Sequence, residues 1–173
     1  MANSRPAAGE LAFGWSCAAA VPLPKITMET LRFSVDVDAP AQHVWNVMLG
    51  LDTYREWAST FREGSTYQGG WNEGDEIRFL GPDDVGTLGG LLGTVVENRP
   101  HEFVSIRYLG SIENGAENRG GPAAGLHENY TFSQAGGVTT LVVELEVPDE
   151  WADDMRGMWS GAIIAIKRMA ERT

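Results

Sequence analysis

The last stretch of the chain, residues 149–172, constrains the fold most, because it predicts one long amphipathic helix. Its apolar side chains recur at three- and four-residue steps and therefore share one helix face. The residues of this face are Trp151, Met155, Met158, Trp159, Ala162, Ile166 and Met169. Asp149 follows Pro148 and is the candidate N-cap residue. A helix of this length spans about 35 Å, so the rest of the chain must supply a long, concave apolar surface to cover it.

The acidic composition argues against partners that are themselves anionic. The 173-residue chain carries 24 acidic and 13 basic side chains, for a net charge of −11. Such a surface repels nucleic acid phosphates and anionic membranes. The terminal helix is too charged to span a membrane, and the single cysteine, Cys17, permits neither an intrachain disulfide nor a cysteine-based zinc site. We therefore expect a cytoplasmic protein with no nucleic-acid partner, no membrane span and no cofactor.

Residues 1–27 differ in composition from the rest of the chain and are interpreted as a disordered leader or a non-native upstream extension. They are rich in alanine and proline, and Met28 is a natural first residue for the domain. The weakly apolar run 11–21 leaves a signal peptide as the alternative, although Glu10, Gly14 and Ser16 weaken that interpretation. Residues 28–173 are expected to form a single domain.

From residue 31 the sequence alternates in the manner of half-buried strands separated by turn residues. Strands are predicted at 31–37, 66–71, 75–80, 86–98, 102–112, 126–134 and 138–147, and two short helices at 38–50 and 52–58. Gly89, Gly90 and Gly93 indicate bulges or strong curvature. The polar, glycine-rich segment 113–125 predicts a loop that is mobile or serves as a lid. This order predicts an α+β fold, in which six to seven antiparallel strands curve around the terminal helix.

Three parts of the sequence resemble a known superfamily. The segments FSVDVDAPAQHVW, TYREWASTFREGSTYQGGWNEGDEIRFLGPD and LHENYTF followed by GGVTTLVVELE are similar to the SRPBCC, or START-like, proteins. The second segment resembles the bacterial branch described as similar to the activator of the heat-shock ATPase. The resemblance covers residues 28–172 and implies the helix-grip fold, with an apolar cavity between the sheet and the terminal helix. Members bind lipids, sterols, polyketides or hormones, some are aromatase/cyclases and a few assist chaperones.

Aromatic and apolar side chains are the strongest candidates for a binding site. No nucleophile or phosphate-binding motif is present, and His43, His101 and His127 are too scattered to indicate a metal site. The predicted ligand-binding residues are Trp45, Trp57, Phe61, Trp71, Ile77, Phe79, Ile106, Tyr108, Glu128, Tyr130, Met155 and Trp159. The alternative for each apolar member of this set is ordinary core packing, since large aromatics dominate most cores. Their number, and their presence in short elements and turns, favours a pocket.

Glu128 is the candidate for acid–base chemistry, together with Tyr130 on the same strand face. If that face is inward, burial raises the pKa of the carboxyl, and Glu128 can transfer protons or hold a polar group of a ligand. A shift of one residue in register would instead place Glu128 outside, with His127 and Asn129 inside.

The sequence leaves three functions open. The first is the binding of a hydrophobic small molecule, such as a lipid, a polyketide or an aromatic metabolite. The second is a cyclase- or hydratase-type enzyme that acts on a hydrophobic substrate. The third is a chaperone co-factor or interaction module whose acidic surface contacts a basic protein surface. A homodimer is compatible with each of them.

Overall fold

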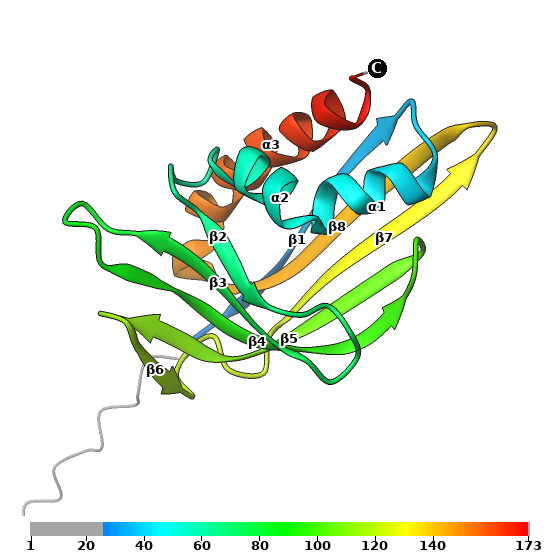
Figure 1. The fold of residues 1–173 in the computed structure, drawn as a ribbon. Coiled ribbons are helices and arrows are strands. Elements are labelled where there is room, and N and C mark those ends of the chain that lie inside the picture. The colour runs from blue at the N-terminus through cyan, green and yellow to red at the C-terminus, as the bar shows by residue number, and fades with distance from the viewer. Residues whose placement is uncertain (1–25, 173) are drawn as a thin grey trace, which may run out of the picture.

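The computed structural model describes residues 26–172, so all but the end of the predicted leader lies outside the described residues. Eight strands and three helices follow one another along this part of the chain (Figure 1). They are β1 (Met28–Val37), α1 (Ala41–Leu49), α2 (Leu51–Ala58), β2 (Thr66–Gly69), β3 (Glu76–Pro82), β4 (Leu88–Arg99), β5 (Phe103–Glu113), β6 (Ala116–Arg119), β7 (His127–Ala135), β8 (Val138–Pro148) and α3 (Asp149–Ala170).

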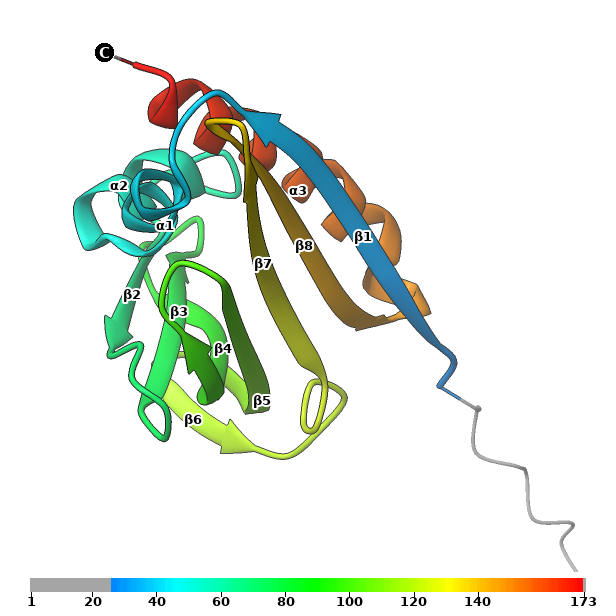
Figure 2. The same cartoon turned by 90° about the vertical axis from the view of Figure 1, so that its right-hand side faces the viewer.

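All strands belong to one antiparallel sheet with the order β1-β8-β7-β5-β4-β3-β2, and β6 pairs with β5 beside this path. The sheet is strongly curved, and α1, α2 and α3 lie on its concave side (Figures 1 and 2). Register shifts between Leu92 and Gly93 and between Val95 and Glu97 mark irregularities in β4, which agrees with the curvature that its glycines predict. The predicted α+β class and helix-grip arrangement are confirmed.

The eighth strand, β6, was not predicted, because it lies inside segment 113–125. This segment turns at Asn114–Gly115 and pairs back onto the second half of β5. It approaches β5 so closely that a Cβ atom on Gly110 would lie 2.0 Å from the carbonyl oxygen of Asn118. Only glycine at position 110 permits this contact. Part of the predicted loop is therefore a hairpin strand.

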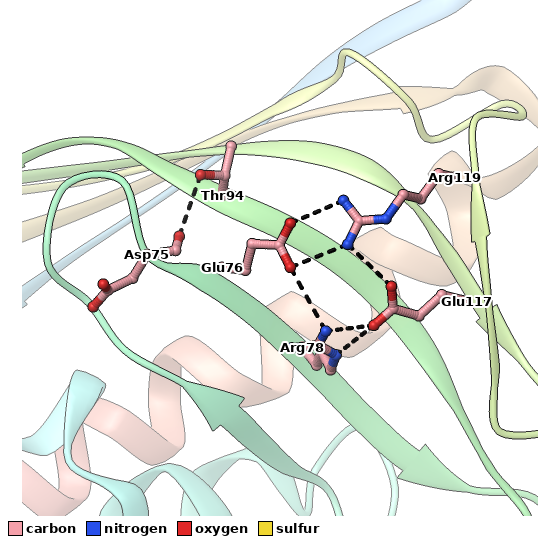
Figure 3. A network of polar contacts seen from close by, with 6 residues as sticks. All are labelled: Asp75, Glu76, Arg78, Thr94, Glu117 and Arg119. Carbon is pink, nitrogen blue, oxygen red and sulfur yellow. Dashed lines mark hydrogen bonds and ion pairs between the residues drawn. The ribbon is translucent and has the colours of Figure 1, made fainter.

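Ion pairs hold β6 over the outer face of β3. Arg119 Nη1 lies 2.8 Å from Glu76 Oε1, and Arg119 Nη2 lies 3.1 Å from Glu117 Oε2. Glu117 also pairs with Arg78, which completes the network (Figure 3). Arg78 and Phe79 are neighbours in β3, so their side chains lie on opposite sides of the sheet. The network thus fixes β6 on the side away from Phe79, where it cannot act as a lid over the concave face.

Helix α3 packs along β1 and β8 and also contacts α1 and α2. Its predicted apolar face is buried at Trp159, Ala162, Ile166 and Met169, whereas Trp151 and Met155 are only partly buried. Among residues 26–172 no helix is both long and apolar enough to cross a membrane.

The predicted N-cap of α3 was wrong. The extended residue Pro148 occupies the cap position, and Asp149 is the first residue of the helix. The reason is that β8 remains paired with β1 up to Pro148 and Met28, so the helix can begin only after that pair. The Asp149 carboxylate accepts a hydrogen bond from the Thr27 hydroxyl. The backbone N–H of Asp149 donates to the Thr27 carbonyl at 3.0 Å.

Replacing Gly157 with alanine should stabilise the protein by about 0.5–1 kcal/mol, because glycine is a poor helix former. Gly157 lies within α3, and a Cβ atom there would meet nothing within 4 Å. Urea unfolding measures the change. Gly137→Ala is the matched control, since its Cβ is equally free but its φ of +85° disfavours any side chain, and it should destabilise. A loss of stability in Gly157→Ala would contradict this prediction.

Candidate functional site

A pocket of about 360 Å³ opens on the concave side of the sheet, between α2, the first half of α3 and strands β3, β4, β5 and β7. Aromatic side chains and methionines form most of its wall. Its lining consists of Tyr54, Trp57, Phe61, Arg62, Ser65, Phe79, Leu80, Gly81, Gly89, Gly90, Leu91, Tyr108, Glu128, Tyr130, Met155, Met158 and Trp159.

The structure brings together most of the residues that the sequence predicts for a binding site. Those that line the pocket are Trp57, Phe61, Phe79, Tyr108, Glu128, Tyr130, Met155 and Trp159. They come from α2 and the turn after it, from three strands and from α3, which are far apart in the sequence. The curvature of the sheet and the position of α3 across it place them around one space.

The other four predicted residues lie outside the lining. Trp45 packs against Phe132 at a ring-centroid distance of 5.2 Å. Trp71 packs behind the wall, with its ring centroid 5.9 Å from that of Phe79. Ile77 and Ile106 are completely buried in the core. These four share the inner side of the fold with the pocket, but core packing accounts for their positions.

Several lining residues were not predicted from the sequence, and Tyr54 is the most informative of them. Tyr54 lies three residues before Trp57 in α2, and their ring centroids are 4.7 Å apart. Helical spacing from Trp57 could have identified it. Met158 likewise belongs to the predicted apolar face of α3, although it is absent from the predicted binding set. Arg62 and Ser65 follow α2 in a turn, where no periodicity indicates which way a side chain points.

Two glycines leave space in the sheet wall of the pocket. Gly81 of β3 pairs with Gly89 of β4, and both line the pocket. A Cβ atom on Gly81 would lie 3.6 Å from the Ser65 hydroxyl, which is an ordinary contact. A larger side chain at position 81 would therefore project toward the pocket. This cross-strand pair becomes visible only once the register of β3 and β4 is known.

Aromatic contacts fix the helical side of the pocket. The ring centroid of Trp159 lies 5.8 Å from that of Trp57 and 5.3 Å from that of Phe61. The indole N–H of Trp57 donates a hydrogen bond to the Met48 carbonyl at 3.2 Å. Trp57 is 1% exposed, so this wall is a rigid extension of the core. The partly buried Met155 is the more adaptable element beside it.

Glu128 lies at the inner side of the pocket, on the inward face of β7. Its row in the sheet is Ile106, Glu128 and Leu145, and all three side chains are buried. The Tyr108 hydroxyl donates a hydrogen bond to Oε2 at 2.5 Å, and the Tyr130 hydroxyl donates to Oε1. The shifted register, with His127 and Asn129 inside, is not the one that the structure shows.

Burial raises the pKa of the Glu128 carboxyl, and the hydrogen bonds from Tyr108 and Tyr130 offset this only in part. Burial also raises the pKa of both tyrosines, and the nearby charge of Glu128 raises it further. Tyr54 has a raised pKa for the same two reasons. The inner wall of the pocket therefore places the carboxyl group of Glu128 among three tyrosine hydroxyls that stay protonated.

Only one basic side chain occurs in the pocket lining that the structure describes. Arg62 is half exposed at the mouth and forms an ion pair with Asp84 in the β3–β4 turn. Across residues 26–172 no group of three or more histidine, cysteine, aspartate or glutamate side chains could hold a metal ion. Apart from Arg62 at the mouth, the described lining of the pocket therefore offers one carboxyl group, three phenols, the Ser65 hydroxyl and an apolar surface.

Comparison with known proteins gives one family match. The sequence profile described as "Polyketide cyclase / dehydrase and lipid transport" matches residues 28–172. Comparison with curated proteins finds no match.

Several solved structures share the fold at low sequence identity. Ms6760 from Mycobacterium smegmatis has a TM-score of 0.66 at 14% identity, covering 83% of this chain and 91% of its own. The Aha1 dimer from Colwellia psychrerythraea has a TM-score of 0.60 at 14% identity, with coverages of 83% and 96%. DynU16, a protein in the dynemicin biosynthetic locus, has a TM-score of 0.62 at 17% identity, but the match covers 82% of this chain and only 47% of DynU16. These likenesses show the fold alone.

Proposed function

The chain belongs to the polyketide cyclase/dehydrase and lipid transport family, and we propose from this premise that its pocket binds a hydrophobic small molecule. The observation that carries the proposal is the pocket itself. Its volume of about 360 Å³ falls within the usual range of small-molecule sites, roughly 300–1,000 Å³. Its wall is mainly apolar and rich in aromatic rings, with one buried carboxyl group to orient a ligand, which is the common composition of such sites.

A neutral fluorescent probe tests this proposal. N-phenyl-1-naphthylamine should bind the full chain saturably, with a rise in fluorescence as it enters the apolar pocket. Gly81→Leu should weaken that binding tenfold or more, because the new side chain fills the space beside Ser65. A tenfold loss corresponds to about 1.4 kcal/mol of binding free energy.

Gly157→Leu is the matched control for this experiment. It adds the same side chain at a helical position where a Cβ meets nothing within 4 Å and which does not line the pocket. It should leave probe affinity close to that of the wild type. The absence of saturable binding, or equal binding by Gly81→Leu and the wild type, would refute the proposal.

A second candidate is an acid–base enzyme of the cyclase or hydratase type that acts on a hydrophobic substrate. It is favoured by one observation, the buried Glu128 carboxyl whose pKa is raised and which contacts Tyr130. A carboxyl group with a pKa nearer neutrality can both donate and accept a proton at physiological pH. Under this hypothesis Glu128→Gln should abolish turnover without abolishing substrate binding. Unchanged turnover in that variant would exclude Glu128 from catalysis.

Homodimerisation, a basic protein partner and a cytoplasmic location stay predictions from the sequence. The Aha1 structure is described as a dimer, and that description applies to Aha1.

A further inference from the structure

We propose that the pocket prefers ligands that carry a protonated amine on an apolar, aromatic-sized body, with the amine held against Glu128. This inference rests on the proposed function and specifies the chemical class of its ligand. It is drawn from three features: an acidic group that has no basic partner among residues 26–172, aromatic rings around that group, and the net charge of the chain.

The first feature is the missing counter-charge. Glu128 is 7% exposed, and its two carboxyl oxygens accept hydrogen bonds from two neutral tyrosines. The single basic residue in the described lining, Arg62, is paired with Asp84 at the mouth. An ionised carboxylate that is buried without a cation carries a large desolvation penalty. A ligand ammonium group would supply the absent positive charge.

The hydrogen-bond pattern favours the ionised form of Glu128 as the binding partner. Both Tyr108 and Tyr130 use their O–H groups to donate to Glu128, one to each oxygen. A carboxylate accepts at both oxygens and has lone pairs left for a further donor. A protonated amine offers three donors, whereas a ketone or ester oxygen offers none. The inner wall is therefore built to receive a donor.

The second feature is the set of aromatic rings. Tyr54, Trp57, Tyr130 and Trp159 line the same pocket as Glu128, and the ring centroids of Tyr130 and Trp159 are 6.1 Å apart. Cations bind favourably over the faces of such rings, most strongly where water is excluded. The same rings exclude water from Glu128, which strengthens its attraction for an ammonium group.

The third feature is the overall charge. The net charge of −11 attracts cations to the surface and repels anions. A ligand carboxylate would also meet Glu128 inside the pocket. Amines should therefore bind better than neutral analogues, and anionic analogues should bind worst.

Three probes of nearly equal size test the inference: 1-naphthylmethylamine, 1-naphthalenemethanol and 1-naphthoate. Their affinities for the full chain would be measured by titration calorimetry at about pH 8, well above the ordinary pKa of a glutamate carboxyl. We expect the amine to bind about tenfold or more tightly than the alcohol, since charge-assisted hydrogen bonds are roughly twice as strong as neutral ones. The naphthoate should bind most weakly. Glu128→Gln should remove the advantage of the amine. Glu73 is exposed in the turn before β3, and the control Glu73→Gln should preserve that advantage.

A measurement on the wild type alone gives a second readout. The groups around Glu128 are Tyr54, Tyr108 and Tyr130, which stay protonated, with Arg62 at the mouth. Burial raises the pKa of Glu128 in the free pocket, so this carboxyl keeps its proton to a higher pH than an exposed glutamate does. An ammonium group that binds there favours the carboxylate, so proton release should accompany binding of the amine but not of the alcohol. Calorimetry in mildly acidic buffers of different ionisation enthalpy detects this release.

The outcomes separate the inference from the proposed function. If the alcohol binds and the amine binds no more tightly, the preference for amines is wrong and the hydrophobic pocket stands. The inference is also wrong if Glu128→Gln keeps the preference, or if amine binding releases no proton. If none of the three probes binds, both the inference and the proposed function fail.

Discussion

Replacing Trp57 with alanine should lower the free energy of unfolding by about 3–5 kcal/mol, the usual cost of removing a large buried aromatic side chain. Trp57 is 1% exposed and lies between the core and the pocket. Its ring centroid is 4.7 Å from that of Tyr54 and 5.6 Å from that of Phe61. The substitution also leaves the Met48 carbonyl without the indole N–H whose hydrogen bond it accepts.

Urea unfolding followed by circular dichroism measures this loss. Trp45→Ala is the matched control, because Trp45 is only partly buried and lies outside the pocket lining. It should cost clearly less than Trp57→Ala. If both substitutions lowered the free energy of unfolding equally, the packing of Trp57 between α2, α3 and the core would not be the reason for the loss.

Replacing Glu128 with glutamine should have the opposite effect and stabilise the free protein at about pH 8, by roughly 1–2 kcal/mol. The pKa of Glu128 is raised in the folded state, chiefly by burial. The folded protein therefore binds this proton more tightly than the unfolded chain, and stability falls as pH rises from the unfolded pKa through the folded one. Glutamine keeps the shape of the side chain and has no charge to bury. Its amide oxygen still accepts from one tyrosine, but its NH2 group can only donate, so the other tyrosine hydroxyl must turn and accept.

The measurement is a pair of unfolding curves for the wild type and Glu128→Gln, at about pH 8 and at about pH 4. The stability gain of the variant should be present at the higher pH and should largely disappear at the lower one, where the wild-type carboxyl is largely protonated in both states. Glu73→Gln, an exposed substitution of the same kind, should show no such pH-dependent gain. If Glu128→Gln is less stable than the wild type at high pH, the two tyrosine hydrogen bonds outweigh the cost of burial.

Much of the fold could be predicted because its signals are periodic. The apolar face of the last helix requires a concave surface, and the alternating strands supply one. The resemblance to the SRPBCC superfamily is confirmed by the family match, and the solved structures show the same fold. The errors are local. Strand β6 lies in a polar, glycine-rich segment without alternation, and it is held by ion pairs such as Arg119–Glu76 that link residues far apart in sequence.

The candidate site could be predicted only in part. Alternation identifies every inward-facing residue of a strand, but only some of these residues lie beside the pocket. Periodicity places Ile106 and Tyr108 on the same face, but only Tyr108 reaches the pocket. The turn between β3 and β4 could be predicted from its residues, but the pairing of Gly81 with Gly89 depends on the register of the two strands, which the sequence pattern does not fix. The orientation of Glu128 was an open alternative for the same reason, since a shift of one residue reverses it.

A crystal structure of the full chain with N-phenyl-1-naphthylamine bound tests the central proposal most directly. The proposal predicts the naphthyl ring within the pocket, in contact with Trp57, Phe79 and Trp159, and with one probe molecule per chain. Probe bound only on the outer surface, with the pocket unchanged, would contradict it.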